Sequence, residues 1–359
     1  MKARLFGQLR SLIQHNPNAD RLLGLLLRCA LHDQDWFEGE VSPYVQSFDL
    51  GLLSFSVDMA DLVESFDRLE YLFGTNTRIH LVINRFNADE RTDLDEIEHL
   101  RDTPLRIESV EFACDPYLCS GQTLLSFDAS WSHMLSCLST WTHLERVDGI
   151  SCTGPSLMGL SPLSLKHIGL DRVYFERDWY TELLNVLSQG GSLVLDAVKM
   201  DMRQRVRLLS HVETLKCVDL LGDHGFVQCH QPIKTRHLSL VGNHGIMSLL
   251  RCFEFHAPVL EQLSVLSIFR DDAFWSPQLF AALERVHTLE LHYLLLSEHV
   301  IEMMSRDDVL PNLRSLSIFK GEVHKEAHQW SIGDHGYRQL VTSGVLDQLE
   351  HFELHDRVR

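Results

Sequence analysis

Apolar and polar residues alternate in two short stretches of the chain, and each stretch runs into a glycine-rich tetrapeptide. The first reads LKCVDLLGDHGF (residues 215–226) and the second reads TRHLSLVGNHGI (residues 235–246). They align without a gap at an offset of 20 residues, which matches Val218 with Leu238 and Leu220 with Leu240. Alternation with a period of two is typical of a strand that buries one face. The pattern predicts two neighbouring strands, at 215–220 and 235–240.

The same template, L-x-x-L-x-L-x-x-N-x-x-L with variations, recurs along most of the chain. Its fourth position recurs at intervals of 20–37 residues, and most intervals are close to the 20–29 residues of a leucine-rich repeat. A single unit cannot bury its own apolar face, so neighbouring units must stack. The fourth positions are Val110, Val147, Ile168, Val198, Val218, Leu238, Leu266, Leu289, Leu316 and Phe352. Eight residues are predicted to be almost fully buried: Val218, Leu220, Leu238, Leu240, Leu289, Leu291, Leu316 and Ile318.

Through this template the chain resembles the leucine-rich repeat superfamily, in an irregular form, over residues 76–359. The resemblance implies an α/β fold, a curved solenoid with a parallel strand ladder on the concave face and helices or loops on the convex face. About ten strands are expected, with RIHLVI (residues 78–83) as a further candidate for the first of them.

The first 75 residues have a different pattern, with apolar residues at helical spacing on both sides of an Asn-Pro turn. Val57–Phe73 has the pattern of an amphipathic helix. We therefore expect residues 1–75 to form a helical cap that protects the first repeat. The segments NPNADRLLGLLL and HDQDW resemble the companion region that precedes repeats in many bacterial leucine-rich repeat proteins, although the Ala-Asp-Trp-Leu segment of that region is missing here. The resemblance implies a bacterial protein.

The tetrapeptides GDHG (222–225), GNHG (242–245) and GDHG (333–336) allow two interpretations. In the first, Asp223 and Asn243 form turns, Asp334 caps a helix, and the glycines adopt unusual backbone angles. In the second, His224 and His244 lie on adjacent strands and share a metal ion. Zinc needs three or four ligands, and no nearby motif supplies the others. We favour turns and predict no metal and no cofactor.

Composition limits the classes of partner and the compartment. The net charge of −18 argues against a nucleic-acid partner, because phosphate contacts need clustered Lys and Arg. No run of about 18 apolar residues could span a membrane, and the start of the chain does not read as a signal peptide. The eight cysteines form no C-x-x-C pair, and several stand in apolar stretches, which favours reduced, buried thiols. We therefore predict a cytoplasmic monomer that binds neither nucleic acid nor membrane.

The motifs of common enzymes are missing: the sequence contains no G-x-S-x-G, no P-loop and no dinucleotide-binding glycine pattern. The interpretation is a protein without enzymatic activity. Three functions are considered: a scaffold that binds a protein partner, an F-box-like substrate-recognition adaptor of a ubiquitin ligase or an effector, and a metal-dependent hydrolase. The scaffold is favoured. No convincing F-box pattern occurs in the N-terminal region.

The position after the last template leucine should form a column on the concave face. Its predicted members are Asp171, Asp201, Leu221, Val241, Phe269, His292, Phe319 and His355. A contiguous apolar stripe on a surface marks an interaction site. Either this stripe contacts a partner, or connecting segments fold over it. The residues predicted to bind a protein partner are Leu221, Val241, Phe269, His292 and Phe319.

Overall fold

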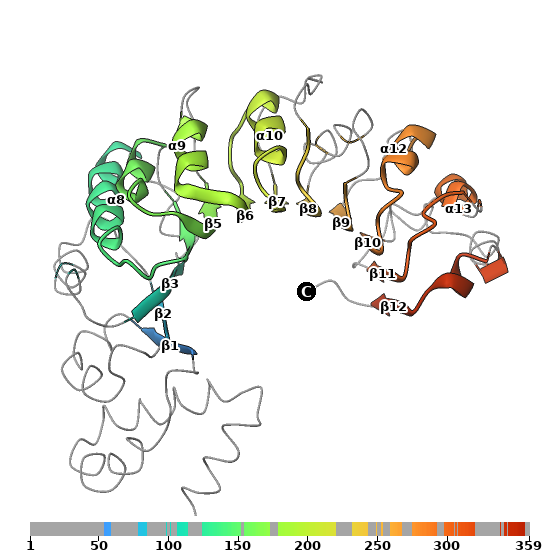
Figure 1. Ribbon diagram of the computed structural model, residues 1–359, viewed down its shortest axis with the longest axis horizontal. Coiled ribbons are helices and arrows are strands. Elements are labelled where there is room, and N and C mark those ends of the chain that lie inside the picture. The colour runs from blue at the N-terminus through green and yellow to red at the C-terminus, as the bar shows by residue number, and fades with distance from the viewer. Residues whose placement is uncertain are drawn as a thin grey trace, which may run out of the picture. The chain divides into compact units, whose positions relative to one another are not determined.

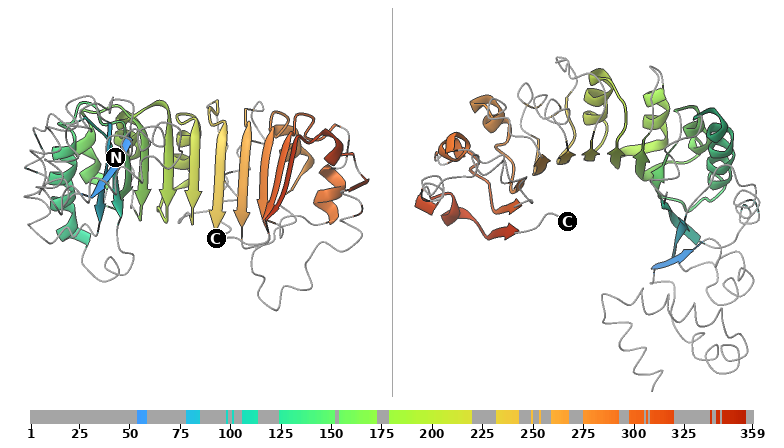
Figure 2. Two further views of the ribbon diagram at one scale, coloured as in Figure 1. Left: turned by 90° about the horizontal axis from the view of Figure 1, so that it is seen from below. Right: turned by 180° about the vertical axis from the view of Figure 1, so that it is seen from behind.

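The computed structural model divides the chain into two compact units, residues 1–168 and residues 169–359. The residues that the structure describes are 54–58, 78–84, 98, 101, 106–113, 124–151, 154–172, 179–219, 232–242, 249, 253, 259–267, 275–292, 298–304, 306, 308–319, 338, 341–342 and 344–355. Figures 1 and 2 show that the described strands alternate along the chain with helices or connecting segments.

The first unit contains a parallel ladder in chain order. Its strands are β1 (Ser54–Asp58), β2 (Arg78–Asn84), β3 (Arg106–Ala113) and β4 (Arg146–Ile150). The strand β5 (Leu165–Asp171) begins in this unit. Helix α8 (Leu124–Leu138) covers the ladder, and its Trp131 ring packs edge-on against Phe112 of β3 with the ring centroids 4.8 Å apart. The short helix η4 (Gly154–Leu160) lies between β4 and β5 in the sequence.

The ladder begins earlier than the sequence predicts. Strand β1 lies inside residues 1–75 and includes Val57 and Asp58, where the sequence pattern predicts the start of a helix. These two residues pair in parallel with Leu81 and Val82 of β2, so strand pairing prevails over the local helical pattern. The other residues between 1 and 75 lie outside the described residues, and the helical cap remains a prediction there.

The second unit holds the more regular ladder. Its strands are β6 (Leu187–Asp196), β7 (Thr214–Val218), β8 (His237–Gly242), β9 (Gln262–Ser267), β10 (Thr288–His292), β11 (Ser315–Phe319) and β12 (His351–His355), each paired in parallel with the next. Its helices are α9 (Trp179–Val186), α10 (Met202–Leu209), α12 (Pro277–Ala282), α13 (Glu298–Met304) and η10 (Leu346–Gln348). In Figure 1 these strands line the inner side of a curve, and α10, α12 and α13 lie on its outer side. The sequence prediction of a parallel ladder with helices outside is confirmed at this level.

Two columns of apolar side chains on neighbouring strands form the core of this unit. The register aligns Leu215, Leu238, Leu263, Leu289 and Leu316 in one column, and Cys217, Leu240, Val265, Leu291 and Ile318 in the other. All ten are at most 3% exposed. For Leu238, Leu240, Leu289, Leu291, Leu316 and Ile318, the predicted burial is confirmed.

The predicted register is wrong in β6, β7 and β9. Val218 is half-buried rather than buried, because Leu215 and Cys217 fill the inward positions of β7. Leu263 takes the position assigned to Leu266, and Leu193 of β6 takes the position assigned to Val198. Val198 is buried but follows the strand. Leu220 lies outside the described residues.

Gly242, the first residue of GNHG, is the part of the tetrapeptides that the structure describes. Gly242 ends β8 with φ +112 and lies beside Asp219, whose backbone N–H donates to the Val241 carbonyl at 3.0 Å. A methyl group on Gly242 would collide with the Asp219 carboxylate. Gly222, with which the sequence alignment pairs Gly242, comes three residues after Asp219. The remaining residues of the three tetrapeptides, including His224 and His244, lie outside the described residues, so the choice between turn and metal ligand stays a prediction there.

Candidate interaction surface

The residues that alternate with the core positions face away from the core. The last of them on each strand of the second unit forms a row that we call the terminal column. Members of the terminal column on adjacent strands are paired in register: Val218 pairs with Val241, Val241 with Leu266, and Phe319 with both His292 and His355. Its members are Asp196, Val218, Val241, Leu266, His292, Phe319 and His355.

Two of the five predicted partner-binding residues can be located in full. Val241 and Phe319 stand in the terminal column and are half-buried. His292 ends β10, but its side chain is not among those that the structure describes. Leu221 and Phe269 lie outside the described residues, and the positions assigned to them in the column belong to Val218 and Leu266. Val218 and Leu266 are not among the predicted residues because the register that the template predicts for β7 and β9 is wrong by three residues.

Asp201 is not in the column either. It is the N-cap of α10, where its carboxylate accepts a hydrogen bond from the Gln204 backbone N–H at 2.9 Å. The Gln204 side chain accepts in return from the Asp201 N–H at 2.8 Å, which completes a capping box. This reciprocal pair satisfies two backbone donors at the start of a helix on the outer side. The corresponding column residue is Asp196, at the end of β6.

The middle of the terminal column is apolar. Val218, Val241 and Leu266 follow one another on β7, β8 and β9, and all three are half-buried. Adjacent strands lie about 4.8 Å apart, so these three side chains form one continuous stripe. The residues two positions earlier on β8 and β9, on the same face of the sheet, are Ser239 and Ser264, and the residue paired with Ser239 on β7 is Lys216.

Toward β5 the corresponding positions are acidic. Burial raises the pKa of Asp171, and the adjacent Arg172 guanidinium, 3.4 Å away, offsets part of that effect. Burial also raises the pKa of Asp196, and the negative charges of Asp171 and Asp219 raise it further. Arg172 and Lys216 counteract these effects in part. The column therefore changes from acidic to apolar between β6 and β7.

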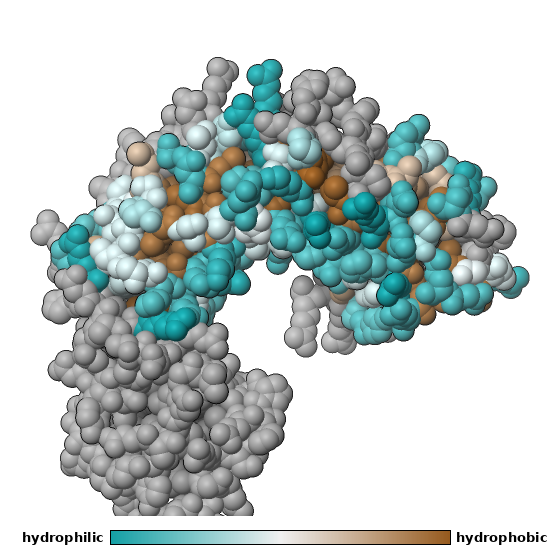
Figure 3. Space-filling model, viewed as in Figure 1, coloured by the Kyte–Doolittle hydropathy of each residue, from teal (hydrophilic) through white to brown (hydrophobic). Residues whose placement is uncertain are grey.

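At the opposite ends of the strands, charged residues alternate in sign. Arg236 bonds Glu261 at 3.1 Å, and Arg314 approaches Glu350 at 3.6 Å. These side chains are mostly well exposed, so each pair contributes little to stability. Figure 3 shows hydrophilic side chains along the inner side of the second unit in this view, with apolar side chains between them and the outer side. The apolar stripe lies at the other ends of the strands.

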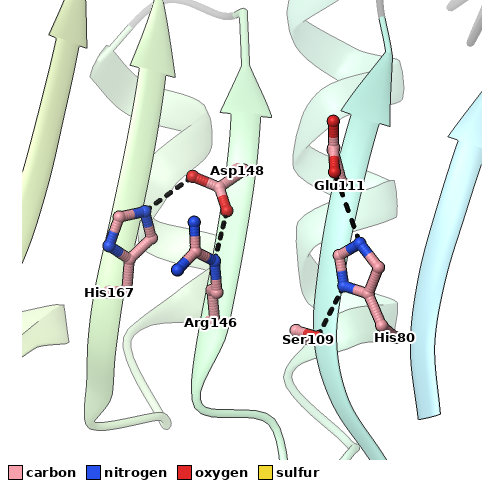
Figure 4. A network of polar contacts seen from close by, with 6 residues as sticks. All are labelled: His80, Ser109, Glu111, Arg146, Asp148 and His167. Carbon is pink, nitrogen blue, oxygen red and sulfur yellow. Dashed lines mark hydrogen bonds and ion pairs between the residues drawn. The ribbon is translucent and has the colours of Figure 1, made fainter. Parts of the chain in front are cut away.

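The first unit presents polar contacts on the solvent-facing side of its strands (Figure 4). His167 Nε2 and Arg146 Nε each lie 2.6 Å from a carboxylate oxygen of Asp148. Burial favours the neutral form of Asp148, but the His167 hydrogen bond and the nearby charges of His167 and Arg146 outweigh it, so the pKa of Asp148 lies below its ordinary value. These contacts link β4 to β5 within the first unit.

A second set of contacts in Figure 4 links β2 to β3. His80 Nδ1 lies 2.6 Å from Ser109 Oγ, and His80 Nε2 lies 3.3 Å from Glu111 Oε2. Serine, histidine and a carboxylate are the residue types of a hydrolytic triad. In such a triad the acid is buried, whereas the Glu111 side chain is 51% exposed and therefore well solvated. We interpret this set as a surface network that joins two strands.

The structure offers little other reactive chemistry among the residues it describes. Cys137 and Cys217 are free thiols and are buried. Burial raises the pKa of both, and that of Cys217 reaches about 12, so neither is a ready nucleophile. Within the described part of the chain, no group of three or more His, Cys, Asp or Glu side chains could hold a metal ion. No helix among the same residues is long and apolar enough to cross a membrane.

No family model and no curated protein matches the chain. Among solved structures, it is similar to an internalin from Listeria monocytogenes, with 12% sequence identity and a TM-score of 0.38. The match covers 96% of this chain and 91% of the internalin chain. A likeness of this size carries no argument about family or function. The parallel ladders and their repeated core positions are themselves typical of a leucine-rich-repeat-like α/β solenoid.

Proposed function

We propose that the protein is a non-enzymatic scaffold that binds a protein partner through the terminal column of the second unit. One observation carries the proposal: three successive strands place Val218, Val241 and Leu266 on the side of the sheet that faces away from the core. A contiguous apolar stripe on a surface is typical of an interaction site. Of the residues predicted from the sequence to bind a partner, this stripe includes Val241, and Val218 and Leu266 stand where the template assigns Leu221 and Phe269.

The surroundings of the stripe support a protein as the ligand. Phe319 and His355 stack with their ring centroids 4.5 Å apart and an angle of 11° between the planes, which extends the column with a flat aromatic surface. Asp196 lies at the other end. An apolar centre with polar ends and aromatic groups is the usual composition of a protein interface.

The other functions have weaker support. The adaptor alternative depends on residues 1–75, of which the structure describes only β1, and no observation favours it. A metal-dependent hydrolase would need a set of metal ligands, and among the described residues no group of three or more His, Cys, Asp or Glu side chains could hold an ion; His224 and His244 lie outside those residues. We also propose that the protein is a monomer and acts in the cytoplasm, since reduced, buried thiols suit a reducing compartment.

Photocrosslinking tests the scaffold proposal. A photoreactive amino acid replaces Val241 in one variant and Val341, which is 65% exposed and outside the ladder, in a control. In an extract of the source cells, we expect a discrete crosslinked protein from position 241 only. Adding Val218→Asp and Leu266→Asp to the position-241 variant should remove that product. The same products from positions 241 and 341, or products that survive the two aspartates, would contradict the proposal.

A further inference from the structure

The apolar side chains of β12 are exposed, although the same positions on neighbouring strands are buried. Phe352 and Leu354 pair in register with Leu316 and Ile318 of β11. Leu316 is 0% exposed and Ile318 is 3% exposed, whereas Phe352 and Leu354 are each 46% exposed. In the sheet order β11 has a strand on each side, and β12 is the last strand described. The second edge of β12 therefore presents an apolar pair that another strand would cover.

The other face of β12 is already held in place by its own contacts. The Glu353 carboxylate bonds His351 Nε2 at 3.0 Å and His355 Nε2 at 2.8 Å. The His355 ring stacks on Phe319 of β11. Because these contacts fix three alternating side chains on the polar face, the strand needs little reorganisation before it pairs at its second edge.

The residues just before the strands indicate which charge an added strand should carry. The Arg314 N–H donates to the His287 carbonyl at 2.9 Å, and the Glu350 N–H donates to the Arg314 carbonyl at 2.8 Å. A further strand in this register would donate to the Glu350 carbonyl. Its side chain at that position would lie beside the Glu350 carboxylate, which is 72% exposed. A basic residue is complementary there, as Arg314 is on the other side of Glu350.

We propose that β12 is a docking edge for one strand of a partner protein. The partner strand adds in parallel and carries Arg or Lys, followed at the second and fourth positions after it by apolar residues. Its backbone pairs with β12, its basic side chain faces Glu350, and its apolar residues cover Phe352 and Leu354. This edge is separate from the apolar stripe, so the inference goes beyond the proposed function.

A peptide supplies the probe. The sequence LRSLSIFK, which copies residues 313–320, has the required arrangement of arginine and two apolar residues. We expect the fluorescein-labelled peptide to bind the full chain saturably, as measured by fluorescence anisotropy. A control peptide with aspartate in place of the second leucine and the isoleucine should bind at least about tenfold more weakly, because it loses both apolar contacts.

Variants of the protein locate the binding site. Phe352→Ser combined with Leu354→Ser should abolish peptide binding, whereas Met158→Ser, at an apolar residue that is 51% exposed in the first unit, should leave it unchanged. Glu350→Lys, at a well-exposed position that should not disturb folding, should weaken binding of LRSLSIFK. The same variant should restore the binding of a peptide in which glutamate replaces the arginine. This charge exchange tests the edge even if the double variant fails to fold.

Three results would overturn the proposal. The first is saturable binding that the Phe352 and Leu354 substitutions leave intact in a folded protein. The second is no binding of LRSLSIFK up to about millimolar concentration, the weak end of measurable affinity. The third is a dimer in light scattering that the same substitutions convert to monomer, since that would assign the edge to a second copy of the chain. Failure of this test leaves the photocrosslinking result at Val241 unaffected, because Val218, Val241 and Leu266 lie on β7, β8 and β9, whereas the edge residues substituted here lie on or next to β12.

Discussion

The register of β7 can be tested by comparing how strongly substitutions at two of its residues destabilise the protein, because the sequence pattern and the structure predict opposite orders. Leu215 is 1% exposed and points into the core, whereas Val218 is half-buried in the terminal column. The sequence pattern assigns the buried position to Val218. We therefore expect Leu215→Ala to destabilise the protein strongly and Val218→Asp to destabilise it weakly.

The magnitudes follow from burial. Leu215→Ala removes three carbon atoms from a closed site, which costs about 2.4 kcal/mol at roughly 0.8 kcal/mol for each buried carbon. The cavity that remains adds to this, and buried leucines replaced by alanine lose about 2–5 kcal/mol in total. Val218→Asp places a carboxylate where water can reach it, so about 1 kcal/mol is expected. An aspartate directed into the core would cost several kcal/mol, because a buried, unpaired charge is poorly solvated.

Urea unfolding followed by circular dichroism measures both changes. The unfolding midpoint should fall clearly for Leu215→Ala and only slightly for Val218→Asp, with similar slopes for both transitions. Leu238→Ala, at a residue for which the sequence and the structure agree, gives the reference loss. If Val218→Asp prevented folding while Leu215→Ala behaved like the parent, the register described here would be wrong.

Three further predictions concern single residues. Gly242→Ala should lower the free energy of unfolding in urea by about 1–3 kcal/mol, because Gly242 has φ +112 and lies against Asp219. Gly344→Ala should cost less, because Gly344 has φ +73 but a Cβ added there would have no atom within 4 Å. Equal losses would contradict the steric argument. Asp148→Asn should lower the melting temperature at pH 7. The pKa of Asp148 in the folded protein is depressed, so its contribution to stability is present above the ordinary aspartate pKa of about 3.9 and is lost as the pH falls through the folded pKa. The difference in melting temperature between the two proteins should therefore persist at pH 5–8 and vanish in acid. Cys217 should resist a thiol reagent at pH 8 until urea unfolds the chain, because its pKa is about 12; mass spectrometry that finds it labelled in the folded protein would refute this.

The sequence predicts the ladder well where each strand carries one unambiguous pair of apolar residues. In β10 the apolar pair is Leu289 and Leu291, with Glu290 between them. In β11 the pair is Leu316 and Ile318, with Ser317 between them. Only one register puts both members of such a pair in the core. The predicted and the observed core positions are the same in these two strands, because period-two alternation allows only one register there.

The pattern is ambiguous where apolar residues occur in two overlapping pairs. The segment LSVLSI contains Leu263 and Val265, and also Leu266 and Ile268, three residues further on. Either pair satisfies the template. The decision comes from the neighbouring strand, since the Glu261 N–H donates to the Arg236 carbonyl at 2.8 Å and fixes Leu263 opposite Leu238. No local feature of the sequence contains this long-range information. The matching tetrapeptides suggested an offset of 20 residues, whereas the strands pair at 23, as Leu215 does with Leu238.

The ambiguity and the candidate surface have one physical origin. A strand of this ladder needs two inward apolar residues, yet β7, β8 and β9 each carry a third, namely Val218, Val241 and Leu266. The third residue makes a slip of three positions plausible in β7 and β9, and a slip of an odd number reverses which side chains face the core. Stability of the core does not require these additional residues, because Leu215 and Cys217 already fill the inward positions of β7. Apolar residues beyond the need of the fold, aligned on three successive strands, are what a surface that buries itself against a partner requires. Val218 and Leu266, which make the register of β7 and β9 ambiguous, and Val241 between them are therefore the residues to substitute first in a search for the partner.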